Sequence, residues 1–106
     1  MNRQSQLFFV ATTTTSATTI ATHAAATYRT IKYIVQLTQG TDYHSTEVSL
    51  IHDGTTVYIT EYGTLFDNAV LGTLSASISS GNILLQVTPG SNSSLTARVV
   101  STAIPV

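Results

Sequence analysis

Residues 47–62 read E-V-S-L-I-H-D-G-T-T-V-Y-I-T-E-Y, and this stretch decides the fold. Two runs of β-branched and aromatic residues flank Asp53 and Gly54, a pair of the type that most strongly predicts a β-hairpin. Glycine tolerates the positive φ of a type I′ turn freely, and aspartate tolerates it better than most residues. The sequence therefore predicts antiparallel strands over 47–52 and 55–62, joined by a turn at Asp53-Gly54.

Apolar residues also alternate with polar ones on both sides of this hairpin. In the strand predicted over 29–38, one face carries Ile31, Tyr33, Val35 and Leu37. Shorter strands, separated by turn residues, are predicted over 18–22, 73–79, 82–88 and 95–101. No helical period of any length is present. The pattern predicts an all-β fold, an antiparallel two-layer β-sandwich of about seven strands, with a small barrel as the alternative.

The composition is poor in charge and rich in hydroxyl groups. Of 106 residues, 8% are charged, 20 are threonine, 12 are serine and none is cysteine. An average soluble domain has roughly 25% charged residues, so this composition suits a protein held inside a larger assembly. The four cations are scattered, which predicts no nucleic-acid partner. No apolar run approaches the ~20 residues of a membrane span.

The first 16 residues differ from the rest of the chain. Leu7, Phe8, Phe9 and Val10 form a continuous apolar run without a period of two, followed by Thr12 to Thr15. We expect an extended N-terminal arm over 1–16 that contacts a neighbouring subunit, attached to a sandwich domain over 17–106. The alternative is that this segment folds back as a first strand of its own sandwich.

The segment 63–71 is too apolar for a freely solvated loop, because it holds Leu65, Phe66, Val70 and Leu71. We expect this loop either to fold over one end of the core or to form part of an interface. Leu65 and Phe66 are its candidate contact residues.

The acidic and histidine side chains form no recognisable catalytic arrangement. Alternation along the hairpin places Glu47 and Glu61 on opposite faces, so they should not form a carboxylate pair. Glu61 is then a strand-end residue or an ion-pair partner of Arg29, Lys32 or Arg98. The spacing of Asp42, His44 and His52 matches no known metal-ligand pattern. No serine stands in a nucleophile motif. We therefore expect no enzymatic activity, no metal and no cofactor.

Tyrosine is the commonest aromatic residue of the chain, and it allows two readings. Tyr58 and Tyr62 fall on one face of their predicted strand and could form a stacking platform for a sugar. Alternatively, the tyrosines cap the sandwich core with their hydroxyls at its edge.

The segment from Thr46 to Gly63, T-E-V-S-L-I-H-D-G-T-T-V-Y-I-T-E-Y-G, resembles structural proteins of tailed bacteriophages, cyanophages among them. The resemblance continues through 71–73, 78–82 and 87–89, and it reaches back to Tyr28-Arg29 and Lys32-Tyr33. It covers the chain from about Ile20 to the C-terminus, whereas residues 1–16 depart from it. The matched positions are turns and strand cores, so they assign no catalytic or ligand role.

This resemblance implies a non-enzymatic phage virion structural protein. A capsid cement (decoration) protein that stabilises the head shell fits best, because the chain is nearly all module. The alternative is a tail, fibre or baseplate module that contacts a host receptor or glycan. The expected partners are the major capsid protein or other virion proteins, and further copies of the chain. A homotrimer is the first expectation and a dimer the second.

Overall fold

The structure is a computed structural model that describes residues 5–106. Over these residues the chain forms eight antiparallel strands and no helix. The strands are β1 (Ser5–Thr12), β2 (Thr18–Ala24), β3 (Tyr28–Gln39), β4 (Asp42–His52), β5 (Val57–Phe66), β6 (Gly72–Ser79), β7 (Asn82–Pro89) and β8 (Leu95–Pro105). The described part of the chain holds no helix long and apolar enough to cross a membrane.

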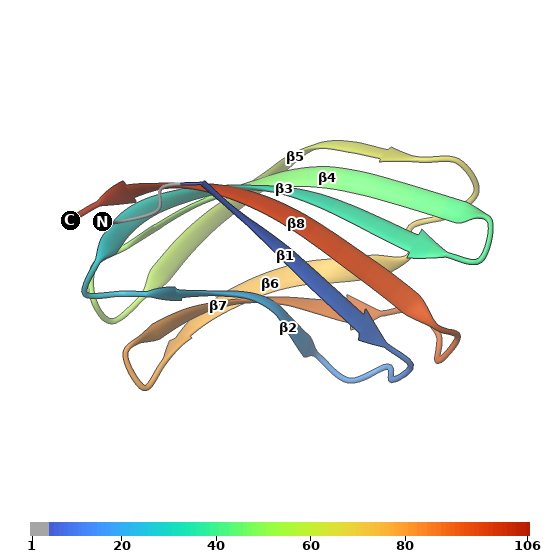
Figure 1. Ribbon diagram of the computed structural model, residues 1–106, viewed down its shortest axis with the longest axis horizontal. Helices are drawn as coiled ribbons and strands as arrows, with labels where there is room; N and C mark the ends of the chain where they lie inside the picture. Colours follow the sequence, from blue (N-terminus) through green and yellow to red (C-terminus); the bar gives the residue numbers. More distant parts are fainter. Residues whose placement is uncertain (1–4) are drawn as a thin grey trace.

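The strands are arranged in two stacked layers (Figure 1). A five-stranded sheet has the order β1-β8-β3-β4-β5, and a three-stranded sheet has the order β2-β7-β6. The predicted all-β antiparallel sandwich is thus confirmed. We call the side of the five-stranded sheet that faces the small sheet its inner face, and the opposite side its outer face.

The core lies between the two layers. On β3 the inward positions Ile31, Tyr33, Val35 and Leu37 are fully buried, as the alternation predicts. Alternate residues of β4, β7 and β8 are buried in the same way. Period-2 patterning places one set of side chains in the core and leaves the other set on the outer surface.

The N-terminal segment belongs to the sandwich over the residues that the structure describes. Residues 5–12 form β1, which pairs with β8 from Ser5↔Thr102 to Thr12↔Leu95. This corrects the expected arm and matches the alternative of a first strand. Phe8 and Val10 pack against the core, while Leu7 and Phe9 point outward. The run hides its alternation because its outward residues are apolar too. Residues 1–4 of the expected arm lie outside the described part.

The central hairpin is antiparallel as predicted, but its turn is longer. His52 pairs with Val57, so the connection comprises residues 53–56 rather than Asp53-Gly54 alone. Only Gly54 of that pair has a positive φ, so the turn is not type I′. Asp53 instead caps the loop, because its Oδ1 accepts the N–H groups of Thr55 and Thr56 at 3.0 and 2.7 Å.

A type I′ geometry does occur at the β6–β7 connection. Ser79 pairs with Asn82, and the two residues between them, Ser80 and Gly81, both have positive φ. Positive φ at both central residues is the requirement of that turn. The sequence predicted a tight turn at this place without its type.

The expected loop over 63–71 is shorter than predicted. β5 continues to Phe66, so residues 63–66 are strand and the connection to β6 begins at Asp67. β5 is the edge strand of the large sheet and is exposed along almost its whole length. Its partner β4 is buried on one face, so the small sheet covers the large one only as far as β4.

Candidate functional site

A pocket of about 520 Å³ lies at the end of β4 and β5 where the chain turns toward β6. This volume is within the range of roughly 300–1,000 Å³ typical of ligand sites. The pocket is open to solvent and is lined by Gln36, Tyr43, His44, Ser45, Leu65, Phe66 and Asp67.

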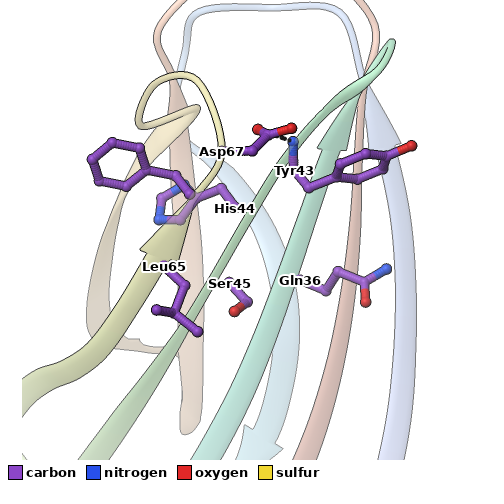
Figure 2. A pocket seen from close by; sticks show the side chains of 7 residues that line it. Gln36, Tyr43, His44, Ser45, Leu65 and Asp67 are labelled. Carbon is purple, nitrogen blue, oxygen red and sulfur yellow. Dashed lines mark hydrogen bonds between the residues drawn. The ribbon is translucent and has the colours of Figure 1, made fainter.

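The floor of the pocket is one row of side chains across three neighbouring strands. Gln36 on β3 pairs with Ser45 on β4, and Ser45 pairs with Leu65 on β5. Figure 2 shows these three side chains side by side on the sheet. Within 5–106, the side-chain polar atoms of Gln36 and Ser45 form no hydrogen bond. An amide and a hydroxyl are therefore available to a ligand next to an apolar surface.

A β-bulge in β5 places Leu65 on this floor. The register shifts between Ser45 and Glu47, so Gly63 and Thr64 together oppose Thr46. Gly63 has a φ of 67°, a left-handed conformation that suits glycine at the first position of a bulge. The extra residue reverses the alternation, which turns Leu65 outward. A glycine inside a strand pattern is a bulge signal that could have predicted this feature.

Hydroxyl groups hold the bulge together. The Thr46 hydroxyl donates to Glu61 Oε2 at 2.9 Å and lies 2.9 Å from the Thr64 hydroxyl. Thr46 is a buried polar residue, so these bonds also satisfy a group that would otherwise be costly to bury. The carboxylate of Glu61 thus has a structural role here, which fits the alternative of a strand-end residue. Within 5–106 it forms no ion pair with Arg29, Lys32 or Arg98.

Tyr43 and Asp67 form the rim of the pocket and clamp its end. The Tyr43 N–H donates to Asp67 Oδ1 at 2.9 Å, and the Asp67 N–H donates to the Tyr43 carbonyl at 3.2 Å. Figure 2 shows the Asp67 carboxylate above the Tyr43 nitrogen, with the tyrosine ring pointing away from it. The ring is about half exposed and free to stack on a ligand. Its position is fixed by main-chain bonds rather than by its own hydroxyl.

His44 lies on the inner side of the same end and supports it. Its Nδ1 accepts the N–H of Leu71 at 3.1 Å, which places the ring proton on Nε2. Its ring meets Phe66 edge to face at 6.2 Å between centroids. Burial lowers the pKa of His44, and the Glu61 carboxylate opposes that shift. A buried neutral ring of this kind anchors the connection to β6 and is not presented to solvent.

The arrangement suits recognition of a neutral, hydroxyl-rich ligand. The pocket offers an exposed aromatic ring, an apolar side chain, an amide, a hydroxyl and one carboxylate, and its lining contains no lysine or arginine. Such a set can stack on a sugar ring and exchange hydrogen bonds with its hydroxyls. Sequence reasoning named Leu65 and Phe66 but did not assign Gln36, Ser45 and Asp67 to a site, because these three come from separate segments.

The other predicted site residues lie elsewhere. Asp53 and Gly54 are at the opposite end of β4, in the hairpin turn. His52 is there too: its Nε2 donates to the Tyr28 carbonyl at 2.6 Å, and its Nδ1 accepts the Gly54 N–H at 2.9 Å. The Asp42, His44 and His52 set is therefore split between the two ends of one strand. Within 5–106, no three His, Asp or Glu side chains lie close enough to hold a metal ion.

The glutamates and tyrosines follow the predicted faces. Glu47 is on the outer face and forms an ion pair with Lys32 at 3.2 Å, whereas Glu61 pairs with the inward residue Val48. The two carboxylates thus lie on opposite faces, as predicted. Tyr58 and Tyr62 share the outer face of β5. Their hydroxyls contact Asp53 and Ser49 respectively, at 3.4 and 3.2 Å.

The fold recurs in solved structures of phage tail proteins. The tailspike protein of Acinetobacter phage vB_ApiP_P1 matches 92% of this chain with a TM-score of 0.60 at 20% identity. The tailspike protein of Acinetobacter baumannii phage AM24 matches 97% with a TM-score of 0.51 at 11% identity. Neither a protein-family model nor a curated protein matches the chain.

The matched regions are small parts of those tailspikes. This chain spans 22% and 26% of their lengths, so the similarity concerns one domain-sized unit of each. At these identities the similarity establishes the fold. The two-layer antiparallel sandwich seen here is thus a fold that these two phage tailspike proteins contain.

Proposed function

We propose that this chain is a non-enzymatic structural module of a phage tail, of the tailspike type, that contacts the host surface through the pocket around Tyr43. The observation that carries the proposal is the fold it shares with two tailspikes over 92% and 97% of its length. The charge-poor, hydroxyl-rich composition supports a place in a virion, where contacts with neighbouring proteins cover the surface.

The tail placement replaces the capsid cement role as the favoured reading. The capsid cement role rests on the observation that the chain is nearly all module, with only an arm added. Residues 5–12 of that arm are a strand of the sandwich, which removes one ground for the preference. The tailspike similarities add weight on the side of the tail. On this proposal, the partners of the chain are other tail proteins and further copies of the chain itself.

The pocket supports host contact by binding rather than by catalysis. Asp67 is the single carboxylate in its lining, and one of its oxygens is already bonded to the Tyr43 N–H. Hydrolysis of a glycosidic bond ordinarily requires a pair of carboxylates on either side of the bond. Stacking on Tyr43 with hydrogen bonds to Gln36 and Ser45 requires no such pair. A surface glycan of the host is therefore the ligand class that we favour.

Location in the particle tests the placement. Quantitative mass spectrometry of purified virions of the phage that encodes the chain would give its copies relative to the major capsid protein. We expect a small number of copies, together with labelling of the tail by an antibody against the chain. A copy number comparable with that of the capsid protein would instead support the cement role.

Binding of bacterial surface oligosaccharides on a glycan array tests the site. We expect Tyr43→Ala to weaken binding by about tenfold or more, equivalent to about 1.4 kcal/mol. Tyr58→Ala is the matched control, because Tyr58 is another exposed tyrosine of the outer face that lies at the other end of the strands. Equal loss in both variants, or no retention of any glycan by the unmodified chain, would contradict the proposed site.

A further inference from the structure

The outer face of the five-stranded sheet carries an unusual number of exposed apolar side chains. Leu7 on β1, Val100 on β8 and Ile34 on β3 are consecutive partners across three neighbouring strands. Phe9 follows Leu7 on the same face of β1 and lies beside Arg98 of β8. We call Leu7, Phe9, Ile34 and Val100 the outer apolar patch. These side chains are between 42% and 71% exposed.

A second apolar group lies on the same face toward the other end of the strands. Register aligns Ile104 of β8 with Thr30 of β3, then Ile51 of β4 and Tyr58 of β5. Ile104, Ile51 and Tyr58 are about half exposed or more. With the outer apolar patch they spread over all five strands of the sheet. The pocket residues Tyr43, Leu65, Gln36 and Ser45 lie on the same outer face but belong to neither group.

The area of these seven side chains reaches the size of a protein–protein interface. If each has roughly 200 Å² to expose, their combined exposed surface is about 800 Å². One partner in a stable complex buries about 800 Å². The row of Thr102, Lys32 and Ser49 separates the two groups, so each group alone is comparable with the largest apolar patch of a typical monomer, about 300–600 Å². The two groups together, rather than either one alone, therefore supply the area of a protein–protein interface.

The charges of this face favour a second copy of the chain as the occupant. Lys32 and Glu47 neutralise each other through their ion pair at 3.2 Å, and Arg98 stacks over the Phe9 ring at 4.9 Å. The face carries both signs and is close to neutral, and the whole chain has a net charge of only −1. Two such faces can approach without strong repulsion, whereas a highly charged partner would find no complementary field.

We propose that the part of the outer face that carries these two apolar groups is the interface between copies of this chain, packed face to face, with the end of the sheet around Tyr43 left uncovered. Two sheets in face-to-face contact about 10 Å apart, with interdigitating side chains, form the same packing that builds the core of a sandwich. The contact assigns Leu7 and Phe9 to the interface and Phe8 and Val10 to the core. It does not depend on the placement in a tail.

Analytical ultracentrifugation of the 106-residue chain over a range of concentrations tests the interface. We expect a concentration-dependent mass above that of the 11.2 kDa monomer. Leu7→Glu and Ile34→Glu should each weaken association by at least about tenfold, because each copy then buries a carboxylate in an apolar contact. Val70→Glu is the matched control, since Val70 is as exposed as Ile34 but lies in the β5–β6 connection.

Folding of the variants must be verified by circular dichroism. Leu7 is on an edge strand and highly exposed, so Leu7→Glu should stay folded even if Ile34→Glu, in the central strand, does not. A monomeric unmodified chain at about 100 µM, near the weak end of specific association, would overturn the proposal. So would an oligomer that a folded Leu7→Glu variant leaves intact.

Thiol accessibility gives a second measurement, because the chain contains no cysteine. Ile34→Cys should react slowly with a thiol reagent in the oligomer and fast after dilution. Val70→Cys should react fast at both concentrations. Equal reactivity of Ile34→Cys at high and low concentration would also overturn the proposal.

Discussion

β3 and β5 belong to the same sheet and carry similar alternating sequences, yet their side chains end in different environments. On β3 the inward side chains, Ile31 among them, are fully buried. On β5 the inward residue Ile59 is 41% exposed, and every residue after Val57 is exposed on either face. β3 lies between β8 and β4, whereas β5 is the edge strand.

This difference shows that alternation decides which face a residue occupies, but not how deeply it is buried. Burial depends on what lies opposite, and the second sheet has only three strands against five. β5 extends past that cover. Its bulge at Gly63 is a device that edge strands use to interrupt regular pairing, and it also reshapes the strand end into the floor of the pocket.

The largest expected effect comes from removing the same side chain on the two strands. Ile31→Ala should lower the free energy of unfolding by about 2–5 kcal/mol, because it leaves a cavity in a close-packed core. Ile59→Ala should cost about 1 kcal/mol or less, since Ile59 is already half in water. Urea unfolding followed by circular dichroism measures both. Equal losses would mean that β5 is covered in solution, as it would be by a partner.

A smaller effect is expected inside the three-stranded sheet, where β6 packs against β7. At Gly72, the first residue of β6, an added Cβ would lie 2.7 Å from Val87 Cγ2 and 3.1 Å from the Thr88 carbonyl. Gly72→Ala should therefore destabilise the fold by about 1–3 kcal/mol. Gly90→Ala is the control, because its Cβ would have no neighbour nearer than 3.8 Å and its φ is not positive. Similar thermal midpoints for both variants would contradict tight packing at β6.

Much of the fold could be predicted from the sequence, for a physical reason. The strands over 29–38 and 82–88 alternate clearly, because their inward residues fill the core and most of their outward residues meet water. β1 was harder to predict. Its outward residues Leu7 and Phe9 are apolar although exposed, so the run had no visible period. An apolar outer face removes the contrast on which the pattern depends.

The pocket was mostly beyond prediction because its floor depends on register. Gln36, Ser45 and Leu65 meet only because β3, β4 and β5 pair as they do, and because one bulge shifts β5. A two-residue turn at Asp53-Gly54 would have joined His52 to Thr55 instead of Val57, which displaces every later partner by two residues. A register error of two residues leaves each side chain on the same face of the sheet but changes its cross-strand partners, so the predicted position of the pocket is wrong.

The smallest effect is confined to mildly acidic pH and concerns His23, a buried histidine on β2 of the three-stranded sheet. His23 is buried against the rings of Phe8, Tyr28 and Tyr33, with centroids 5.3–5.7 Å away. Its Nε2 bonds the Ser101 hydroxyl at 3.1 Å, while Nδ1 has no partner within the described residues. Burial lowers the pKa of His23 below its usual 6.5.

A lowered pKa means that the unfolded chain binds the proton more readily than the folded one. The free energy of unfolding should therefore be constant above pH 6.5 and decrease as the pH falls below that value. In His23→Phe this decrease should be smaller, because one of the buried rings that resist protonation is gone; His44, whose pKa burial also lowers, remains.

Thr60→His, on exposed β5, should leave the decrease unchanged, because a histidine in water has the same pKa folded or unfolded. Urea titrations between about pH 7.5 and pH 5 compare the three proteins. A decrease in His23→Phe as steep as in the unmodified chain would contradict this prediction. It would show that water enters between the two sheets near β2, so that burial at β2 and at β5 differs less than the structure indicates.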